Sequence, residues 1–384
     1  MKDPLPLTRS VKSCIWCSVA VAAPYLFFLL PGQAVLGPLP AFYASLVTIY
    51  LLPTALCMAA MIGGALAMGV GVAVSVGAMA SLTGMPGVKL TAVYLLPILI
   101  AFFAVVYFQI PFWKSLAIVA GAHLAALAAV YMLAQQMAGG DLYTAAGNAV
   151  ADFLENWEMG DLMLYQLYDG MGMLDLKSEL ADTALEKVLG GYQLSQAARA
   201  DLLLSVRAMV TEAMQALVPN LIVSRSILGG VSCLLLPLRF GFLAEEKRAF
   251  KREAPADLTE EGKQKIDFPD LGMPPFSQWH LPRGIGWQVG AALAVGYLLR
   301  ANNTPALGIA GAILYAGASA VFTVQGAAAI NFLQKQRGSR RFWRVLVPCL
   351  LALTQILVFV GVFDQISNFR RLRKPPEPKE DFDL

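Results

Sequence analysis

The sequence predicts an all-α protein, a polytopic bundle of about nine transmembrane helices that carries a small extracytoplasmic helical insertion. Hydrophobic residues make up 57% of the 384 residues and charged residues only 14%, whereas roughly a quarter of the residues in a soluble domain are charged. The apolar runs recur at the length of about 20 residues that a helix needs to cross a bilayer. They are continuous rather than alternating, which argues against a transmembrane β-barrel.

Nine apolar segments have this length, and the expected range is eight to nine helices. They are Ser13–Leu30, Ala41–Ala60, Met61–Leu82, Leu90–Phe108, Trp113–Ala134, Ala216–Phe240, Gly284–Leu299, Ala306–Leu333 and Arg344–Phe363. Two of these segments lie within Ala41–Leu82, one long apolar stretch that we divide near Gly63 and Gly64. The first segment is expected to be retained, because it is long enough to span and no clean signal-peptide cleavage site ends it.

Two hydrophilic stretches interrupt the apolar segments and define the domain organisation. The predicted parts are five N-terminal membrane helices in 1–134, an acidic amphipathic insertion in 135–215, a membrane helix in 216–241, a basic loop in 242–283, about three membrane helices in 284–368 and a disordered tail in 369–384. Twelve acidic and four basic residues lie between Asp141 and Glu212. Apolar residues in this stretch recur at helical spacing, so several short amphipathic helices are expected.

The distribution of basic residues sets the orientation, since lysine and arginine favour cytoplasmic loops. With the basic N-terminus inside, five crossings place the acidic insertion outside. A sixth crossing after the insertion then places the basic loop inside. The C-terminal end is inconsistent with this scheme, because the basic clusters Lys335–Arg344 and Arg370–Lys374 both favour the inside and one apolar run separates them. Either the tail lies outside against the rule, or the helix count is wrong by one near Gly284–Leu333.

Small residues mark two helix faces for close packing, since packing drives helix association in lipid. Gly63, Ala67, Gly71 and Ser75 are spaced four apart, and Gly308 and Gly311 enrich a later helix. These faces form tight contacts inside the bundle, or alternatively they dock a partner protein or slide during transport.

Ionisable side chains at membrane depth are costly and therefore indicate function. Arg225 lies within an apolar segment and needs an anion, a cluster of carbonyl groups or a route to the headgroups. We predict that it clamps an anionic ligand or lipid headgroup, with snorkelling to the outer headgroups as the alternative. His123 lies in the middle of its segment and either bonds a neighbouring helix or contacts a ligand.

Three amides complete the set of candidate ligand contacts: Gln325, Asn331 and Gln355. Amides in membrane helices also bond between helices, so a structural role is the alternative. No catalytic motif and no nucleotide-binding loop is present, no cofactor is expected, and two histidines exclude a histidine-rich metal site. No basic patch of the kind that binds nucleic acid occurs. We therefore expect a protein that is not an enzyme.

Several short motifs carry a resemblance to a known family. They are Pro274–Pro282 before a membrane helix, Asn302-Asn303, Gln325-Gly326, Asn331-Phe332, and Asp364 followed by Asn368-Phe369-Arg370, with Pro38-Leu39-Pro40 and Leu217-Val218-Pro219 in agreement. This pattern resembles the YybS-like family of bacterial membrane proteins, and it spans most of residues 13 to 373. The family is thought to be similar in fold to the substrate-binding S-components of energy-coupling-factor transporters. The stretch Asp141–Glu212 is longer than a simple six-helix S-component would have.

The resemblance implies a transporter subunit in a bacterial cell membrane that holds a small molecule or lipid between its helices. Energy would come from separate energy-coupling subunits. The alternative is a non-transporting scaffold or regulator of cell-envelope processes, in which the polar residues at membrane depth are all structural. A membrane enzyme acting on lipids ranks last, because no pair of acid and base groups can be assembled.

Overall fold

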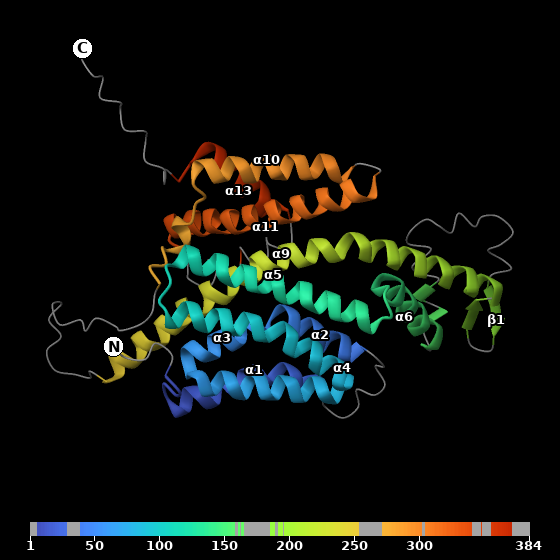
Figure 1. Cartoon of the computed structure of the whole chain (residues 1–384), viewed down its shortest axis with the longest axis horizontal. Coiled ribbons are helices and arrows are strands. Elements are labelled where there is room, and N and C mark those ends of the chain that lie inside the picture. Colours follow the sequence, from blue (N-terminus) through green and yellow to red (C-terminus); the bar gives the residue numbers. More distant parts are fainter. Residues whose placement is uncertain are drawn as a thin grey trace, which may run out of the picture. The chain divides into compact units, whose positions relative to one another are not determined.

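The computed structural model describes residues 6–28, 39–157, 160–161, 163–164, 185–188, 191–194, 196–252, 271–301, 304–339, 347 and 355–370. The chain forms two compact units (Figure 1). Unit 1 comprises Met1–Val130 and Asn220–Leu384, and unit 2 comprises Tyr131–Pro219. The described residues are almost entirely helical, in agreement with the predicted fold class.

The N-terminal part of unit 1 contains helices α1 (Val11–Phe28), α2 (Leu39–Tyr50), α3 (Leu52–Gly63), α4 (Ala65–Tyr107) and most of α5 (Phe112–Met137), whose last seven residues belong to unit 2. The predicted division near Gly63 and Gly64 is confirmed, since α3 ends there and Gly64 adopts a φ of 102°. A Cβ atom on Gly64 would lie 2.6 Å from the carbonyl oxygen of Leu7, so only glycine fits beside the N-terminal segment. An additional break separates α2 from α3, and the two helices meet at 52°.

Helix α4 merges two of the predicted segments. Gly84 has a φ of 68° and a ψ of −161°, which is not helical, and it divides α4 into two helices. Glycine populates this conformation without the steric penalty that a side chain would bring. The predicted segments Met61–Leu82 and Leu90–Phe108 therefore lie on either side of this break.

The remaining elements of unit 1 are the C-terminal part of α9 (Gln196–Arg252), the 3₁₀ helix η3 (Phe276–Gln278), α10 (Arg283–Arg300), α11 (Pro305–Gln336) and α13 (Ile356–Ser367). Helix α9 continues to Arg252, so the first residues of the predicted basic loop are helical. Residues 253–270, residues 344–346 and 348–354 of the predicted segment Arg344–Phe363, and 371–384 of the predicted tail lie outside the described residues.

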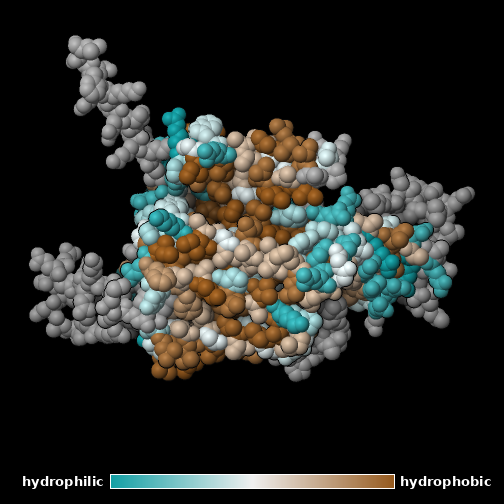
Figure 2. Space-filling view, in the orientation of Figure 1, coloured by the Kyte–Doolittle hydropathy of each residue, from teal (hydrophilic) through white to brown (hydrophobic). Residues whose placement is uncertain are grey.

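The predicted count of nine membrane helices is not confirmed by the described residues. They contain four helices that are long and apolar enough to cross a membrane, with α4 counted as one, or five if the bent pair α2 and α3 forms one span. Helices α1 and α13 are apolar but shorter. Unit 1 exposes many large apolar side chains, such as Leu96, Ile100, Phe359 and Leu298. The visible face of its helices is mostly hydrophobic (Figure 2). Such a surface is typical of contact with lipid rather than water.

Unit 2 contains α6 (Leu142–Asn156), a two-stranded antiparallel hairpin of β1 (Leu185–Val188) and β2 (Gly191–Leu194), and the first part of α9. Its small core includes Ala151, Leu154 and Val206. The hairpin corrects the prediction of helices alone, because the spacing of Leu185 and Val188 was taken as helical. Gly190 and Gly191 follow, and two adjacent glycines disfavour a helix and favour a turn.

Candidate functional site

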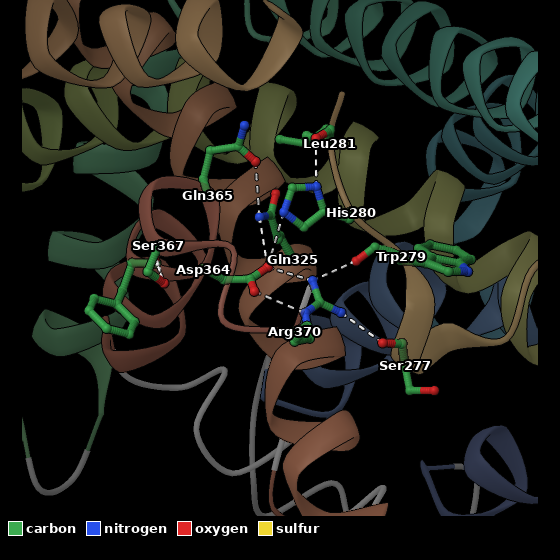
Figure 3. Close-up of polar contacts among 10 residues, drawn as sticks. Ser277, Trp279, His280, Leu281, Gln325, Asp364, Gln365, Ser367 and Arg370 are labelled. Atoms are coloured by element: carbon green, nitrogen blue, oxygen red, sulfur yellow. Dashed lines mark hydrogen bonds and ion pairs between the residues drawn. The ribbon is translucent and has the colours of Figure 1, made fainter. Parts of the chain in front are cut away.

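A buried ion pair between Asp364 and Arg370 forms the centre of the most extensive polar cluster among the described residues (Figure 3). Both side chains are fully buried. The guanidinium donates from Nε to Oδ1 of Asp364 at 3.0 Å and from one terminal nitrogen to Oδ2 at 2.5 Å. Such a bidentate pair is among the strongest and most directional polar contacts in proteins.

The end of α13 brings the two charges together. The helix ends at Ser367, and Asn368 takes the left-handed conformation with a φ of 46°. Asparagine tolerates this conformation better than most residues with a side chain. The backbone N–H of Asn368 donates to the carbonyl oxygen of Asp364 at 2.9 Å. The chain thus turns back, and Arg370 reaches the carboxylate one turn inside the helix.

Arg370 also binds the segment that precedes α10. Two further N–H groups of the guanidinium donate to the carbonyl oxygens of Ser277 and Trp279, each at 2.8 Å. The Trp279 indole donates to the carbonyl of Pro274 at 3.0 Å and its ring lies 4.9 Å from that of Phe112. One guanidinium therefore joins α13, the loop before α10 and, through Trp279, the start of α5.

Gln325 of α11 supplies the third side of the cluster. Its amide nitrogen donates to Oδ2 of Asp364 at 3.0 Å and to the side-chain oxygen of Gln365 at 3.1 Å. Nε2 of His280 lies 3.7 Å from the same Oδ2. Gly286 of α10 leaves the room that Gln365 needs, since a Cβ atom there would lie 1.7 Å from its amide nitrogen.

The cluster combines a carboxylate, a guanidinium, an imidazole and two amides within an apolar bundle. Such a set of hydrogen-bonded groups can fix helices relative to one another. No group of three or more histidine, cysteine, aspartate or glutamate side chains suited to a metal ion occurs in the described part of the chain.

Arg225 occupies a different polar site, at the break between α2 and α3. Its side chain donates to the carbonyl oxygen of Ile49 from two nitrogens, at 3.0 and 3.2 Å, and to that of Tyr50 at 2.5 Å. The guanidinium also lies 5.2 Å from the centre of the Tyr50 ring. Carbonyl groups at the end of α2 lack helical partners and carry partial negative charge, which explains their attraction for a cation. Of the partners predicted for Arg225, the structure provides the carbonyl cluster.

His123 of α5 is fully buried and faces Tyr94 of α4 and Cys233 of α9. Nδ1 lies 2.9 Å from the carbonyl oxygen of Val119, and Nε2 lies 3.7 Å from the sulfur of Cys233. The ring packs edge-on against Tyr94, whose hydroxyl donates to Ile49, the same carbonyl that Arg225 binds. Arg225 and His123 are thus linked through shared neighbours, and Gln325 belongs to the separate Asp364 cluster.

The last two candidate contacts lie apart from these sites. Gln355 is exposed and accepts a hydrogen bond from the Tyr315 hydroxyl at 3.2 Å. Asn331 is half-buried in the last part of α11. Of the five predicted ligand contacts, the structure therefore brings only Arg225 and His123 near one another.

The predicted small residues lie where helices meet closely. A Cβ atom on Gly63 would lie 3.2 Å from the Cα of Cys14 in α1, and one on Gly71 would lie 2.8 Å from Leu56 in α3. Gly311 abuts the backbone at Leu299 and Arg300 in α10. Ala67 and Ser75 are fully buried and Gly308 is half-buried.

Asp364 and Arg370 are not among the candidate site residues predicted from the sequence, which assigned Arg370 to the predicted tail 369–384. Their proximity to a helix end is the reason, because charges at helix ends usually reach water. The signal that could have found the site was the set of motifs carrying the family resemblance. Ser277, His280, Gln325, Asp364 and Arg370 all belong to those motifs, and the structure gathers them in one place.

Part of the chain is similar to a known family. Residues 262–365 match the family described as a predicted membrane protein, DUF2232. The matched region contains His280, Gln325 and Asp364, and Arg370 lies just beyond it. No curated protein matches the chain, and no solved structure matches it either. In its C-terminal part, the chain is therefore similar to a family of predicted membrane proteins.

Proposed function

We propose that the chain is a multi-pass protein of a bacterial cell membrane that holds a small molecule or lipid between its helices and catalyses no reaction. The observation that carries this proposal is the position of Arg225, whose side chain is only 9% exposed and lies at the break between α2 and α3. A broken helix at membrane depth is tolerated where it is buried in protein or lines a cavity. Ends of broken helices also bind ligands and ions in many transporters.

The chemistry of this place favours a ligand with an anionic or strongly polar group and an apolar body. Arg225 offers positive charge, and Tyr25 and Thr48 add hydroxyl groups within the neighbouring helices, 2.7 Å apart. The apolar helices around them would accommodate the rest of a lipid-like molecule. Energy coupling by a separate ATPase module remains part of the proposal because of the resemblance to S-components, and it requires partner subunits.

Native mass spectrometry of the purified chain in lipid nanodiscs tests the proposal. A bound small molecule or retained lipid is expected on the wild-type protein and is expected to be lost in Arg225→Leu. Arg239→Leu is the matched control, since Arg239 is exposed on the same helix. Arg225→Lys keeps the positive charge, so retention of the ligand in this variant would show that the loss in Arg225→Leu comes from the missing charge rather than from misfolding. Equal retention in Arg225→Leu, with the protein still monodisperse, would reject Arg225 as the binding group.

A second function, a non-transporting membrane scaffold, is favoured by one observation. Arg225, His123 and Gln325 each have polar partners within the protein itself. Affinity purification in mild detergent separates the two functions. Recovery of an ATPase and its membrane partner supports the transporter subunit, whereas recovery of cell-envelope or division proteins supports the scaffold.

A further inference from the structure

We infer that α13 is a re-entrant half-helix, which enters and leaves the bilayer at the same end of unit 1, and that the ion pair of Asp364 and Arg370 is the latch that holds it there. The inference is independent of the ligand site proposed at Arg225. It follows from the direction of α13, its length and the positions of the basic residues.

The contacts of α13 fix its direction. Gln365, near its end, packs against Gly286 at the start of α10 and bonds Gln325 in the second half of α11. Gln355, just before its start, bonds Tyr315 in the first half of α11. Helix α13 therefore runs parallel to α11 and antiparallel to α10, and Figure 1 shows the same course.

Its length is too short for a crossing. Twelve residues of α-helix extend about 18 Å, whereas the hydrocarbon core is about 30 Å thick. Arg337 follows the end of α11, and Arg370 follows the end of α13. Since the two helices are parallel, both basic residues lie at the same end of the bundle.

The other basic segments of unit 1 lie at this end as well. The backbone N–H of Phe112, at the start of α5, donates to Leu271 in the loop that Arg370 binds. Helix α9 is antiparallel to α5, because its Gly229 and Gly230 pack against His123 and Ala120. Glu245 of α9 thus lies toward the start of α5, where it pairs with Arg9 at 3.6 Å. One end therefore carries the start of α1, the end of α9, the start of α10 and the ends of α11 and α13.

This arrangement removes the conflict with the positive-inside rule. Helix α4 begins beside Gly63, whose carbonyl binds the N–H of Arg9, and it ends at Tyr107, just before Phe112. Both ends of α4 therefore lie at the basic end, and the chain reverses at Gly84. The first eight of the nine apolar segments are then crossings, and the ninth contains the re-entrant helix. The segment before α1, the end of α9, the start of α10 and Arg370 then share the cytoplasmic side.

The latch explains how so short a helix keeps its place. Asp364 binds α11 through Gln325, and Arg370 binds the carbonyls of Ser277 and Trp279. The exit of α13 is thereby tied to the entry of α10. Gly326 and Gly361 allow α11 and α13 to touch through their backbones.

Single cysteines in a chain whose five native cysteines are replaced test the topology. Ser339→Cys and Ser367→Cys are expected to react with a membrane-impermeant maleimide from the same side, and Thr304→Cys from the opposite side. Reaction of Ser367→Cys from the side of Thr304→Cys would overturn the inference. A reporter fused after Leu384 of the otherwise unaltered chain repeats the test: a fluorescent protein should fluoresce there, and alkaline phosphatase should be inactive. Phosphatase activity would overturn it equally.

A second labelling experiment tests the latch. In the chain whose native cysteines are replaced, Ser277→Cys lies at a buried position and is expected to be protected from the maleimide. It is expected to lose that protection when Arg370→Gln is added. The charge swap of Asp364→Arg with Arg370→Asp should restore it, and Arg300→Gln should leave it unchanged. If Arg370→Gln prevents insertion, recovery by the swap supports the latch. Protection that persists in Arg370→Gln, or a swap that recovers nothing, rejects it.

Discussion

A buried charge in an apolar bundle is stable only when its hydrogen-bonding groups are satisfied. Arg370 meets this requirement with a carboxylate and two carbonyl groups, and Arg225 meets it with the carbonyl groups at the end of α2. The two arginines thus solve the same problem differently. Arg370 has a partner of opposite charge, whereas Arg225 brings a net positive charge among helix-end dipoles. This difference is why the ligand proposal rests on Arg225 and the latch on Arg370.

Loss of Arg370 is expected to be costly. Arg370→Gln leaves the Asp364 carboxylate buried and unpaired, so the free energy of unfolding should fall by roughly 3–5 kcal/mol. Thermal unfolding of the detergent-solubilised protein measures the change. Arg207→Gln is the control, because its ion pair with Asp152 is exposed and surface pairs contribute about 0–1 kcal/mol. Equal effects of the two substitutions would contradict the role assigned to the buried pair.

Helix ends and close helix–helix contacts decide the geometry of this protein more than helix interiors do. Breaks at Leu51, Gly64 and Gly84 divide a long apolar stretch, and Asn368 turns the chain at the end of α13. Close helix–helix contacts depend on glycine, since Gly326 and Gly361 allow the backbones of α11 and α13 to touch. Each of these positions tolerates little change.

Gly326→Ala is expected to force α11 and α13 apart. A Cβ atom there would lie 2.0 Å from the carbonyl oxygen of Leu357, which is backbone and cannot rotate away. Overpacking of this kind costs about 1–3 kcal/mol or more, and the melting temperature should fall. Gly290→Ala in α10 is the matched control, because nothing lies within 4 Å of its position. There the substitution should be neutral or stabilise by up to ~1 kcal/mol.

The stability of the first turn of α6 is expected to depend on pH. The Asp141 carboxylate accepts hydrogen bonds from the Thr144 hydroxyl and from the backbone N–H groups of Thr144 and Tyr143, and these bonds lower its pKa below the usual 3.8. Its cap is therefore intact above the unfolded pKa of about 4 and is lost as the pH falls through the lower folded value. Amide exchange at Tyr143 and Thr144 should accelerate, relative to the intrinsic rate, in that acidic range.

Asp141→Asn provides the control for this dependence, since asparagine also caps helices but does not titrate. Exchange that accelerates equally in acid in both proteins would show that Asp141 is not the titrating group.

At the scale of the whole molecule, hydrocarbon is the solvent for most of unit 1. Its exposed surface is rich in large apolar side chains, whereas unit 2 carries hydrophilic residues on its visible face (Figure 2). The charge distribution along the chain then orients unit 1 in the membrane. These features require no knowledge of a ligand.

The intact chain is expected to remain in the membrane fraction after an alkaline carbonate wash and to be released only by detergent. Four or five apolar helices of membrane-spanning length anchor it through the hydrophobic effect, which high pH does not abolish. A peripheral membrane protein, released by the same wash, is the control. Release of this chain into the supernatant would contradict its integration.

The sequence alone determined the membrane class, the helical fold and most segment boundaries, because apolar runs of bilayer length permit only helices. It also located the break at Gly64 and named Arg225 and His123 as buried polar residues. Only the tertiary structure decided which polar groups meet, since Asp364, Gln325 and the carbonyls of Ser277 and Trp279 are far apart along the chain. The direction of α13 was equally beyond the sequence. Hydropathy records how apolar a segment is and carries no information on whether it crosses the bilayer or turns back.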